Sequence, residues 1–199
     1  VNKNNSIFLN KINFTESKNS IKIKNIDFSP NKKIKKIDQI DVDLVNNNDQ
    51  ISQINIRRKK SNYSIISKIF DGTKILDRIL FSEGDGNFFD IFEKINSKVM
   101  INLETAYISS EDYLTNFKAV IVVTNNDIKD LILTSKFSNK EDLKLSIKTN
   151  PNNEKITNLF AGNAKPLVEK YDFIKGFEGG YLKLDTIEIN KVSNSNLKI

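Results

Sequence analysis

The sequence contains no cysteine, no histidine and no tryptophan. Without cysteine there is no disulfide framework and no thiolate-bound zinc, and without histidine there is no Ser-His-Asp or Cys-His catalysis and no histidine-ligated metal. The acidic residues between positions 71 and 93 show no spacing that would place two carboxylates across a cleft, and Glu83–Asn87 does not meet the register of a calcium loop. We therefore expect no enzymatic activity, no cofactor and no bound metal.

The sequence also lacks a hydrophobic run long enough to span a membrane, although shorter runs occur. The longest one, Ala119–Val123, is far below the roughly 20 residues that a membrane-spanning helix needs, and no signal peptide is visible. The chain starts on Val1 and ends on an apolar alternation. We interpret it as a fragment of a longer protein, with any anchor or export signal outside it.

Positive charge is present in excess, with a net charge of +6 and two dense clusters at Lys32–Lys36 and Arg57–Lys60. Such clusters permit attraction to nucleic acid or to anionic lipid headgroups, but in a lysine-rich chain they are typical of solvated turns and strand edges. Nucleic-acid binding would favour aromatic residues interleaved with the basic ones, and only Tyr63 lies near a cluster. We expect no nucleic-acid partner and keep a basic nucleic-acid-binding module as a further alternative.

Most of the chain alternates between apolar and polar residues, which predicts strands with one apolar face. Asparagine-rich and Asp/Ser-containing segments separate the alternating stretches and are typical of turns. The short gaps favour antiparallel neighbours, so we predict a mostly β protein with a meander of seven or more strands. The alternating apolar sets are Ile21/Ile23, Ile40/Val42/Leu44, Ile54/Ile56, Val99/Ile101/Leu103, Phe117/Ala119/Ile121/Val123, Leu143/Leu145/Ile147 and Leu182/Leu184.

Helical spacing interrupts this pattern in two regions. Short helices are predicted near 75–93, where apolar residues recur three and four positions apart, and at 164–174. In the second region Asn163 is the predicted N-cap, Pro166 falls in the first turn and Gly176 is the predicted C′ residue. The residues that share the predicted docking face are Leu167, Val168, Tyr171 and Ile174.

The pair Gly179-Gly180 precedes the next alternating stretch and is predicted to begin a strand over 179–190. Glycine pairs at such positions allow a positive φ angle or a close backbone approach. We expect one of the two glycines to have a positive φ or to lie against the helix.

The phrase from Ala164 to Leu184 resembles the AsmA/TamB-like superfamily of bacterial envelope proteins, in particular the AsmA-like region of the YhdP type. In that region a short helix rich in leucine and small residues is followed by a Tyr or Phe turn, a Gly-Gly pair and an alternating strand. The matching residues here are Ala164, Leu167, Val168, Tyr171, Phe173, Ile174, Gly176, Gly179, Gly180, Leu182 and Leu184.

The resemblance covers residues 60–199, with short helices near 75–93, antiparallel strands over 97–149, the helix at 164–174 and the strand at 179–190. Residues 1–59 are matched only by their strand-like character, and we predict that they form a strand-rich N-terminal section of the same sheet. The resemblance implies a long, curved antiparallel sheet shaped as an open, elongated trough. It also implies a periplasmic protein tethered to the inner membrane, with phospholipid transport toward the outer membrane as its role.

The apolar strand residues are the candidate lipid-contacting positions under this interpretation, and the same residues would form the core of a closed fold. The expected partners are phospholipid acyl chains, and a membrane through an anchor outside the chain. A structural β-rich surface or adhesin domain, with both sheet faces covered by protein, is the alternative. The candidate residues are Val99, Ile101, Leu103, Phe117, Ala119, Ile121, Val123, Leu143, Leu145 and Ile147.

Overall fold

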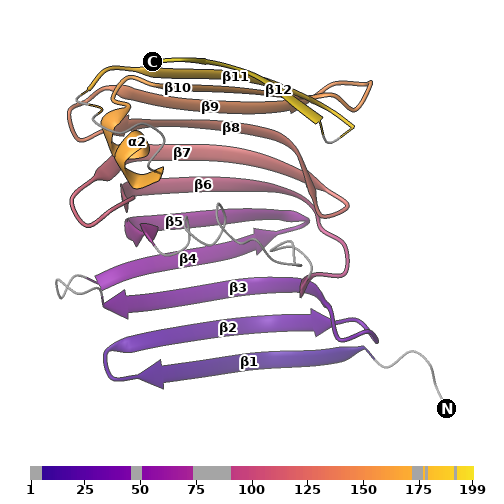
Figure 1. The fold of residues 1–199 in the computed structure, drawn as a ribbon. Coiled ribbons are helices and arrows are strands. Elements are labelled where there is room, and N and C mark those ends of the chain that lie inside the picture. Colours follow the sequence, from indigo (N-terminus) through magenta and orange to yellow (C-terminus); the bar gives the residue numbers. More distant parts are fainter. Residues whose placement is uncertain (1–5, 46–50, 74–90, 172–176, 178, 191) are drawn as a thin grey trace.

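The described residues form one open sheet of twelve strands in sequence order (Figure 1). The computed structural model of the protein describes residues 6–45, 51–73, 91–171, 177, 179–190 and 192–199. The mostly β fold predicted from the alternation is confirmed, and the open sheet is compatible with the curved trough that the resemblance implies. The strands are β1 (Ile7–Glu16), β2 (Asn19–Phe28), β3 (Ile34–Val45), β4 (Ile51–Lys59), β5 (Asn62–Asp71), β6 (Asn96–Tyr107), β7 (Tyr113–Thr124), β8 (Asp127–Phe137), β9 (Asp142–Thr149), β10 (Lys155–Ala161), β11 (Leu182–Ile189) and β12 (Val192–Lys198).

Every neighbouring pair is antiparallel except β5 and β6, which are parallel. This pair departs from the predicted continuous meander. A parallel pair requires the chain to cross from one end of the sheet to the other, and the crossing lies between Asp71 and Asn96. Near the end of this crossing, Phe92 bridges Ile34 of β3, and the Glu93 N–H donates to the Ile34 carbonyl at 2.9 Å. The chain therefore contacts β3 before it enters β6, although β4 and β5 lie between these two strands in the sheet.

The short helices predicted near 75–93 fall mainly on residues 74–90, which lie outside the described residues. In the described part of that range, Phe92 belongs to the bridge with Ile34 and is not helical.

The antiparallel register places the turns at two opposite ends of the sheet. Turns 16–19, 107–113 and 137–142 lie at the same end as helix α2 (Lys165–Tyr171), which follows β10, and we call this the α2 end. Turns 28–34, 59–62, 124–127 and 149–155 lie at the other end, which we call the open end. The two ends are the left and right sides of the sheet in Figure 1.

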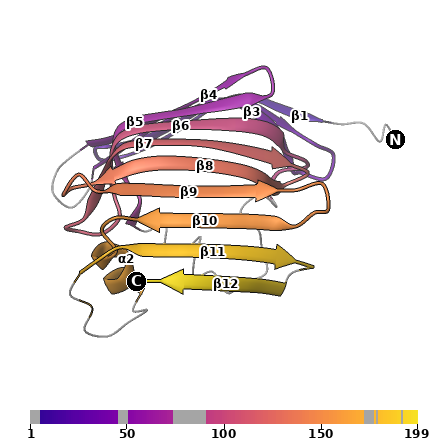
Figure 2. The ribbon, with the colours of Figure 1, turned by 90° about the horizontal axis from the view of Figure 1, so that it is seen from above.

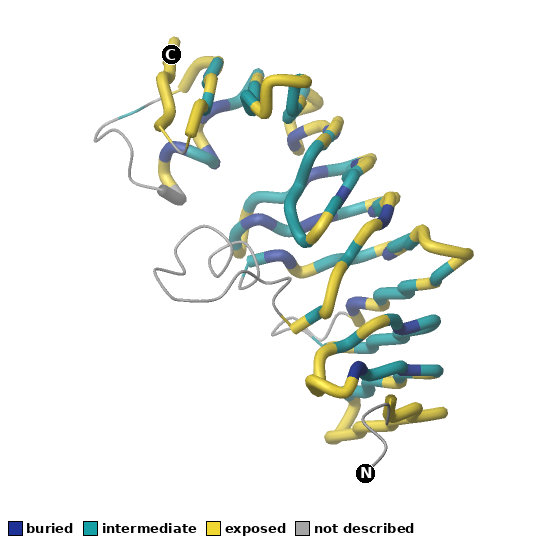
Figure 3. Tube along the Cα trace, turned by 90° about the vertical axis from the view of Figure 1, so that its right-hand side faces the viewer, coloured by how far each residue is buried: buried dark blue, intermediate teal, exposed yellow. Residues whose placement is uncertain are grey.

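The sheet is one continuous layer (Figure 2), and it bends into an arc when its strands are viewed end-on (Figure 3). Helix α2 lies on the concave side, which we call the inner face, and the opposite side is the outer face. The boundary predicted at residue 59 falls in the turn between β4 and β5, and the sheet continues through it.

The main core sits at the α2 end, where the helix packs on β6 to β11. Partly buried Phe70, Phe117, Leu167 and Phe177 surround it. Among the described residues, this core covers the α2 end of the inner face over β6 to β11. The buried members of the core are Leu103, Ala106, Ile108, Leu114, Phe137, Leu143, Ala161, Ala164, Val168 and Leu182.

Helix α2 confirms the helix predicted at 164–174 as far as Tyr171. Residues 172–174 lie outside the described residues. Leu167 and Val168 pack against the core as predicted, and Pro166 lies in the first turn. The predicted cap is one residue early, since the Ala164 carbonyl, and not that of Asn163, accepts from the Val168 N–H at 2.9 Å. Ile174, Gly176 and the side chain of Tyr171 lie outside the described part of the chain.

Gly180 fulfils the expectation for the glycine pair. Its φ angle is +134°, and its carbonyl accepts from the Ala164 N–H at 2.9 Å, which joins the start of α2 to the segment before β11. The regular strand then begins at Leu182, three residues later than the predicted start at 179, because this backbone pairs with the helix start and not with a strand.

Gly180→Val should destabilise the protein by roughly 1–3 kcal/mol, because a β-branched residue is strained at this φ angle. Gly179→Val is the matched control, since a Cβ at Gly179 would meet no atom within 4 Å. Urea unfolding of both variants measures the difference. Equal unfolding midpoints for the two variants would show that the φ angle of Gly180 is not required.

Candidate functional site

A continuous aliphatic row crosses the inner face and takes one residue from every strand. Each member is the direct cross-strand partner of the next, so their side chains lie on the same face. Eleven strand-to-strand steps of about 4.8 Å give the row a length of roughly 50 Å. In order from β1 to β12 the aliphatic row is Ile12, Ile23, Ile40, Ile56, Ile65, Ile101, Ala119, Leu133, Leu145, Leu159, Leu184 and Leu197.

Most of the aliphatic row is only half-buried. Ala119 is fully buried, whereas Ile12 and Leu197 at the two edges are 39% and 50% exposed. Ile40, Ile56 and Ile65 are half-buried and do not belong to the core under α2 within the described part of the chain. The length and continuity of this apolar strip make the inner face the candidate binding surface of the fold.

The structure brings all ten predicted strand residues to the inner face. Three of them, Ile101, Ala119 and Leu145, belong to the aliphatic row. Leu103, Phe117 and Leu143 lie toward the α2 end and contribute to the core. Val99, Ile121 and Ile147 lie toward the open end and are half-buried, whereas Val123 there is buried.

The aliphatic row contains members that the sequence prediction missed. Leu133 on β8, Leu159 on β10 and Leu197 on β12 were not among the predicted residues, although Leu131 and Leu133 already alternate with polar neighbours. Alternation assigns a residue to one of two faces. Only the strand register shows which residues of different strands form one row.

The outer face differs in chemistry. The cross-strand row next to the aliphatic row carries Lys22, Asp41 and Asn55 on β2 to β4 and Asn102, Lys118, Thr134 and Lys144 on β6 to β9. Exposed apolar residues such as Ile66, Ile132 and Phe160 occur among these polar residues. The sheet is therefore amphipathic, with its unbroken apolar strip on the inner face.

The inner face becomes charged at the open end. On β8 and β10, Lys129 and Lys155 reach the same carboxylate, that of Asp127, at 2.9 and 3.3 Å. Burial raises the pKa of Asp127, but the hydrogen bond from Lys129 and the charge of Lys155 outweigh it, so the pKa lies below its usual range. Asp127 therefore stays ionised at neutral pH and holds the two ammonium groups together.

A second polar group lies at the open end on β3 to β5. Arg58 pairs with Asp38 at 3.3 Å, and the Tyr63 hydroxyl accepts from the Ile37 N–H at 3.4 Å. The two basic clusters of the sequence also lie at this end, in or beside turns 28–34 and 59–62. The prediction of turns is confirmed for Lys32, Lys33 and Lys60, whereas the other residues of the clusters lie at the ends of the interior strands β3 and β4 and not on edge strands.

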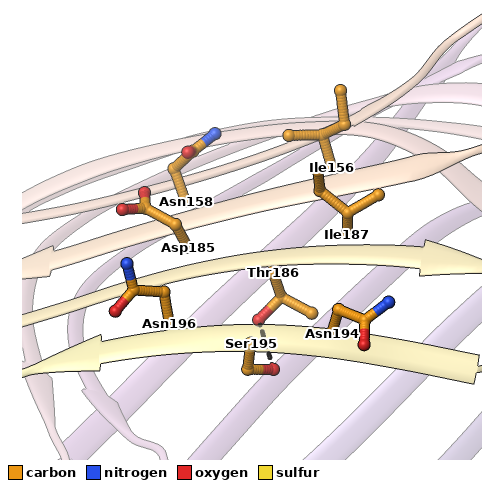
Figure 4. Close-up of a pocket in the computed structure, with 8 residues that line it drawn as sticks. All are labelled: Ile156, Asn158, Asp185, Thr186, Ile187, Asn194, Ser195 and Asn196. Carbon is orange, nitrogen blue, oxygen red and sulfur yellow. Dashed lines mark hydrogen bonds between the residues drawn. The ribbon is translucent and has the colours of Figure 1, made fainter.

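A shallow hollow lies over β10 to β12 (Figure 4). Ile156, Asn158 and Asp185 project to one side of the sheet there, whereas Thr186 and Ser195 pair with each other at 3.0 Å. Its one carboxylate, Asp185, is paired with Lys183 at 3.1 Å. The lining therefore lacks the two carboxylates that acid-base catalysis would use.

The described residues contain no group of acidic side chains that could hold a metal ion. None of the helices in the described part of the chain has the length and hydropathy needed to cross a membrane. Comparisons of the chain with protein-family models, with curated proteins and with solved structures found no match.

Proposed function

We propose that the chain is a section of a non-enzymatic AsmA-like cell-envelope protein, which holds phospholipid acyl chains on the inner face of its sheet. The section forms part of a groove through which phospholipid moves between the inner and outer membranes of a bacterium. In this proposal the chain lies in the periplasm and is tethered to the inner membrane by a segment of the parent protein outside residues 1–199.

The observation that carries the proposal is the aliphatic row. It is continuous over all twelve strands, and most of it is half-buried, so an extended apolar molecule can lie along it. Burial of apolar surface is favourable by about 25 cal/mol per Å², and an acyl chain has only apolar surface to bury. The resemblance of residues 164–184 to AsmA-like proteins supports the same interpretation.

The alternative of a surface or adhesin domain predicts that protein covers both faces of the sheet. The described strands form one sheet, and α2 covers only the end of the inner face over β6 to β11. The aliphatic row is half-buried along β2 to β5 and exposed at Ile12 on β1, which favours the groove over a closed β-sandwich, because a sandwich buries its apolar face against a second sheet.

A charge placed in the aliphatic row should abolish most lipid binding. Leu145→Glu puts a carboxylate under the acyl chain, where it loses its water. We expect the Kd for phosphatidylethanolamine with a fluorescent acyl chain to rise at least about tenfold, which corresponds to ~1.4 kcal/mol. Fluorescence titration of the purified chain measures this change.

Ser146→Glu is the matched control, because Ser146 is the next residue of β9 and lies on the outer face. It introduces the same charge on the same strand, and we expect parent-like affinity. An equal loss of binding in both variants, or no loss in Leu145→Glu, would contradict the proposed function.

A further inference from the structure

The hollow over β10 to β12 lies on the outer face, opposite the aliphatic row. Its outward side chains come from strand positions that alternate with Leu159, Leu184 and Leu197, and successive strand residues point to opposite faces. The hollow has a volume of about 360 Å³. Cross-strand register arranges these side chains as two rows of three, one polar and one mainly aliphatic. The polar row is Asn158, Asp185 and Asn196, and the other row is Ile156, Ile187 and Asn194 (Figure 4).

The amides of the hollow are available to a ligand. Asn194 and Asn196 are exposed, and within the described part of the chain neither side-chain amide has a hydrogen-bond partner. Each amide offers two N–H donors and one carbonyl acceptor. Asp185 adds a carboxylate acceptor, and its charge is balanced by Lys183 at 3.1 Å. The hollow therefore has no net charge, which favours an uncharged polar ligand over a phosphate or an acidic peptide.

An aromatic pair adjoins the hollow on the side of the α2 end. Phe160 is two residues beyond Asn158 on the same face of β10, which corresponds to about 7 Å along the strand. Its ring stacks on the ring of Tyr181, with the centroids 6.4 Å apart and an angle of 29° between the planes. The two residues are 37% and 49% exposed, so the pair is accessible to a ligand. Aromatic rings exposed in this way pack on the C–H-rich face of a sugar ring.

An N-acetylated amino sugar carries groups that match each part of this surface. Its ring has an apolar face, its hydroxyls both donate and accept hydrogen bonds, and its acetamido group joins an amide to a methyl group. Ile187 is the direct cross-strand partner of Asn194 and is 46% exposed. The acetamido amide can therefore pair with Asn194 while its methyl group packs on Ile187.

We propose that the outer face over β10 to β12 binds an oligosaccharide of N-acetylhexosamine units. One sugar ring lies on Phe160 and Tyr181, and the acetamido group of a linked unit lies against Asn194 and Ile187. Phe160 and Ile156 are four residues apart on one face of β10, or about 13 Å, which accommodates more than one sugar ring. The site goes beyond the proposed function, because it lies on the other face of the sheet and takes a different class of ligand.

The test is an NMR titration of the purified chain with two saccharides. Tri-N-acetylchitotriose is the probe, and cellotriose is its comparison, because it has the same linkage between its sugars but no acetamido group. We expect tri-N-acetylchitotriose to shift the side-chain amide signals of Asn194 and Asn196. Cellotriose should bind at least about fivefold more weakly, because it lacks the group that pairs with Asn194.

Two variants test the two parts of the site. Asn194→Asp keeps the shape of the side chain but removes its N–H donors, and Phe160→Ala removes the aromatic ring. Each should raise the Kd for tri-N-acetylchitotriose roughly fivefold. Asn194 is exposed on an edge strand, so Asn194→Asp keeps the proposal falsifiable if Phe160→Ala folds poorly. Asn102→Asp is the matched control with parent-like affinity, because Asn102 lies on the outer face of β6, away from the hollow.

Three results would overturn the site. They are no binding of tri-N-acetylchitotriose by the parent chain, equal binding of cellotriose, and the same loss of affinity in Asn102→Asp as in Asn194→Asp. None of them bears on acyl binding, which concerns the inner face. Selective binding of tri-N-acetylchitotriose that is weakened by Asn194→Asp and kept by Asn102→Asp would establish the saccharide site.

Discussion

Val168→Asp is expected to unfold at a much lower urea concentration than the parent chain, with a loss of about 3–5 kcal/mol in the free energy of unfolding. Val168 is 0% exposed and lies in the core between α2 and the sheet. A carboxylate at this position would be buried among apolar residues such as Ala161 and Leu182, with no cation beside it among the core residues. The cost of an uncompensated buried charge is one of the largest that a single substitution can cause.

Two further substitutions in α2 test whether the loss of stability follows the burial of the substituted side chain. Leu167 is half-buried against the core, so Leu167→Asp should cost less than Val168→Asp. The Glu169 side chain is 56% exposed and pairs with Lys165 at 3.6 Å, so Glu169→Ala should change stability by less than about 1 kcal/mol. A Val168→Asp chain that unfolds at the parent midpoint would show that α2 does not pack on the sheet in solution.

The sequence predicts the strands well because their alternation is local. Lys144, Leu145, Ser146 and Ile147 alternate in the sequence, and they alternate between the two faces of β9 in the structure. The parallel pairing of β5 with β6 was not predictable in the same way. It depends on the path of the chain between Asp71 and Asn96, and no periodic pattern records that path.

The helix shows where local rules are sufficient and where they fail. Pro166, Leu167 and Val168 have the predicted places, because first-turn preference and apolar spacing depend only on near neighbours. The cap at Ala164 was missed because the Ala164 N–H is satisfied by the Gly180 carbonyl, a contact between residues sixteen positions apart. The Gly180 carbonyl therefore fixes the start of the helix by a tertiary contact, whereas a side-chain cap would have accepted from an N–H inside the first turn.

The candidate site could not be predicted from the alternation of apolar and polar residues alone. Alternation placed Ile101 and Leu145 on an apolar face, but their membership of one row follows from the register of β6 to β9. The grouping of Lys129 with Lys155 around Asp127 likewise depends on which strand ends meet. Neither lysine stands out in the sequence, because each of the twelve described strands carries at least one lysine.

The central claim is that acyl chains contact the inner face, and photo-crosslinking at two adjacent residues of β8 tests it most directly. Leu133 belongs to the aliphatic row, whereas Ile132 is its neighbour on the outer face and is 53% exposed. Both are aliphatic, so non-specific hydrophobic contact would favour Ile132, the more exposed residue. Only a lipid held on the inner face favours Leu133.

The measurement uses a photo-reactive residue at either position, irradiation with vesicles of phosphatidylethanolamine and phosphatidylglycerol, and detection of the lipid adduct by mass spectrometry. We predict a strong adduct at Leu133 and little at Ile132, with the same contrast between Ile121 and Val122 on β7. Adducts that are equal at Leu133 and Ile132, stronger at Ile132, or absent from both would contradict the account.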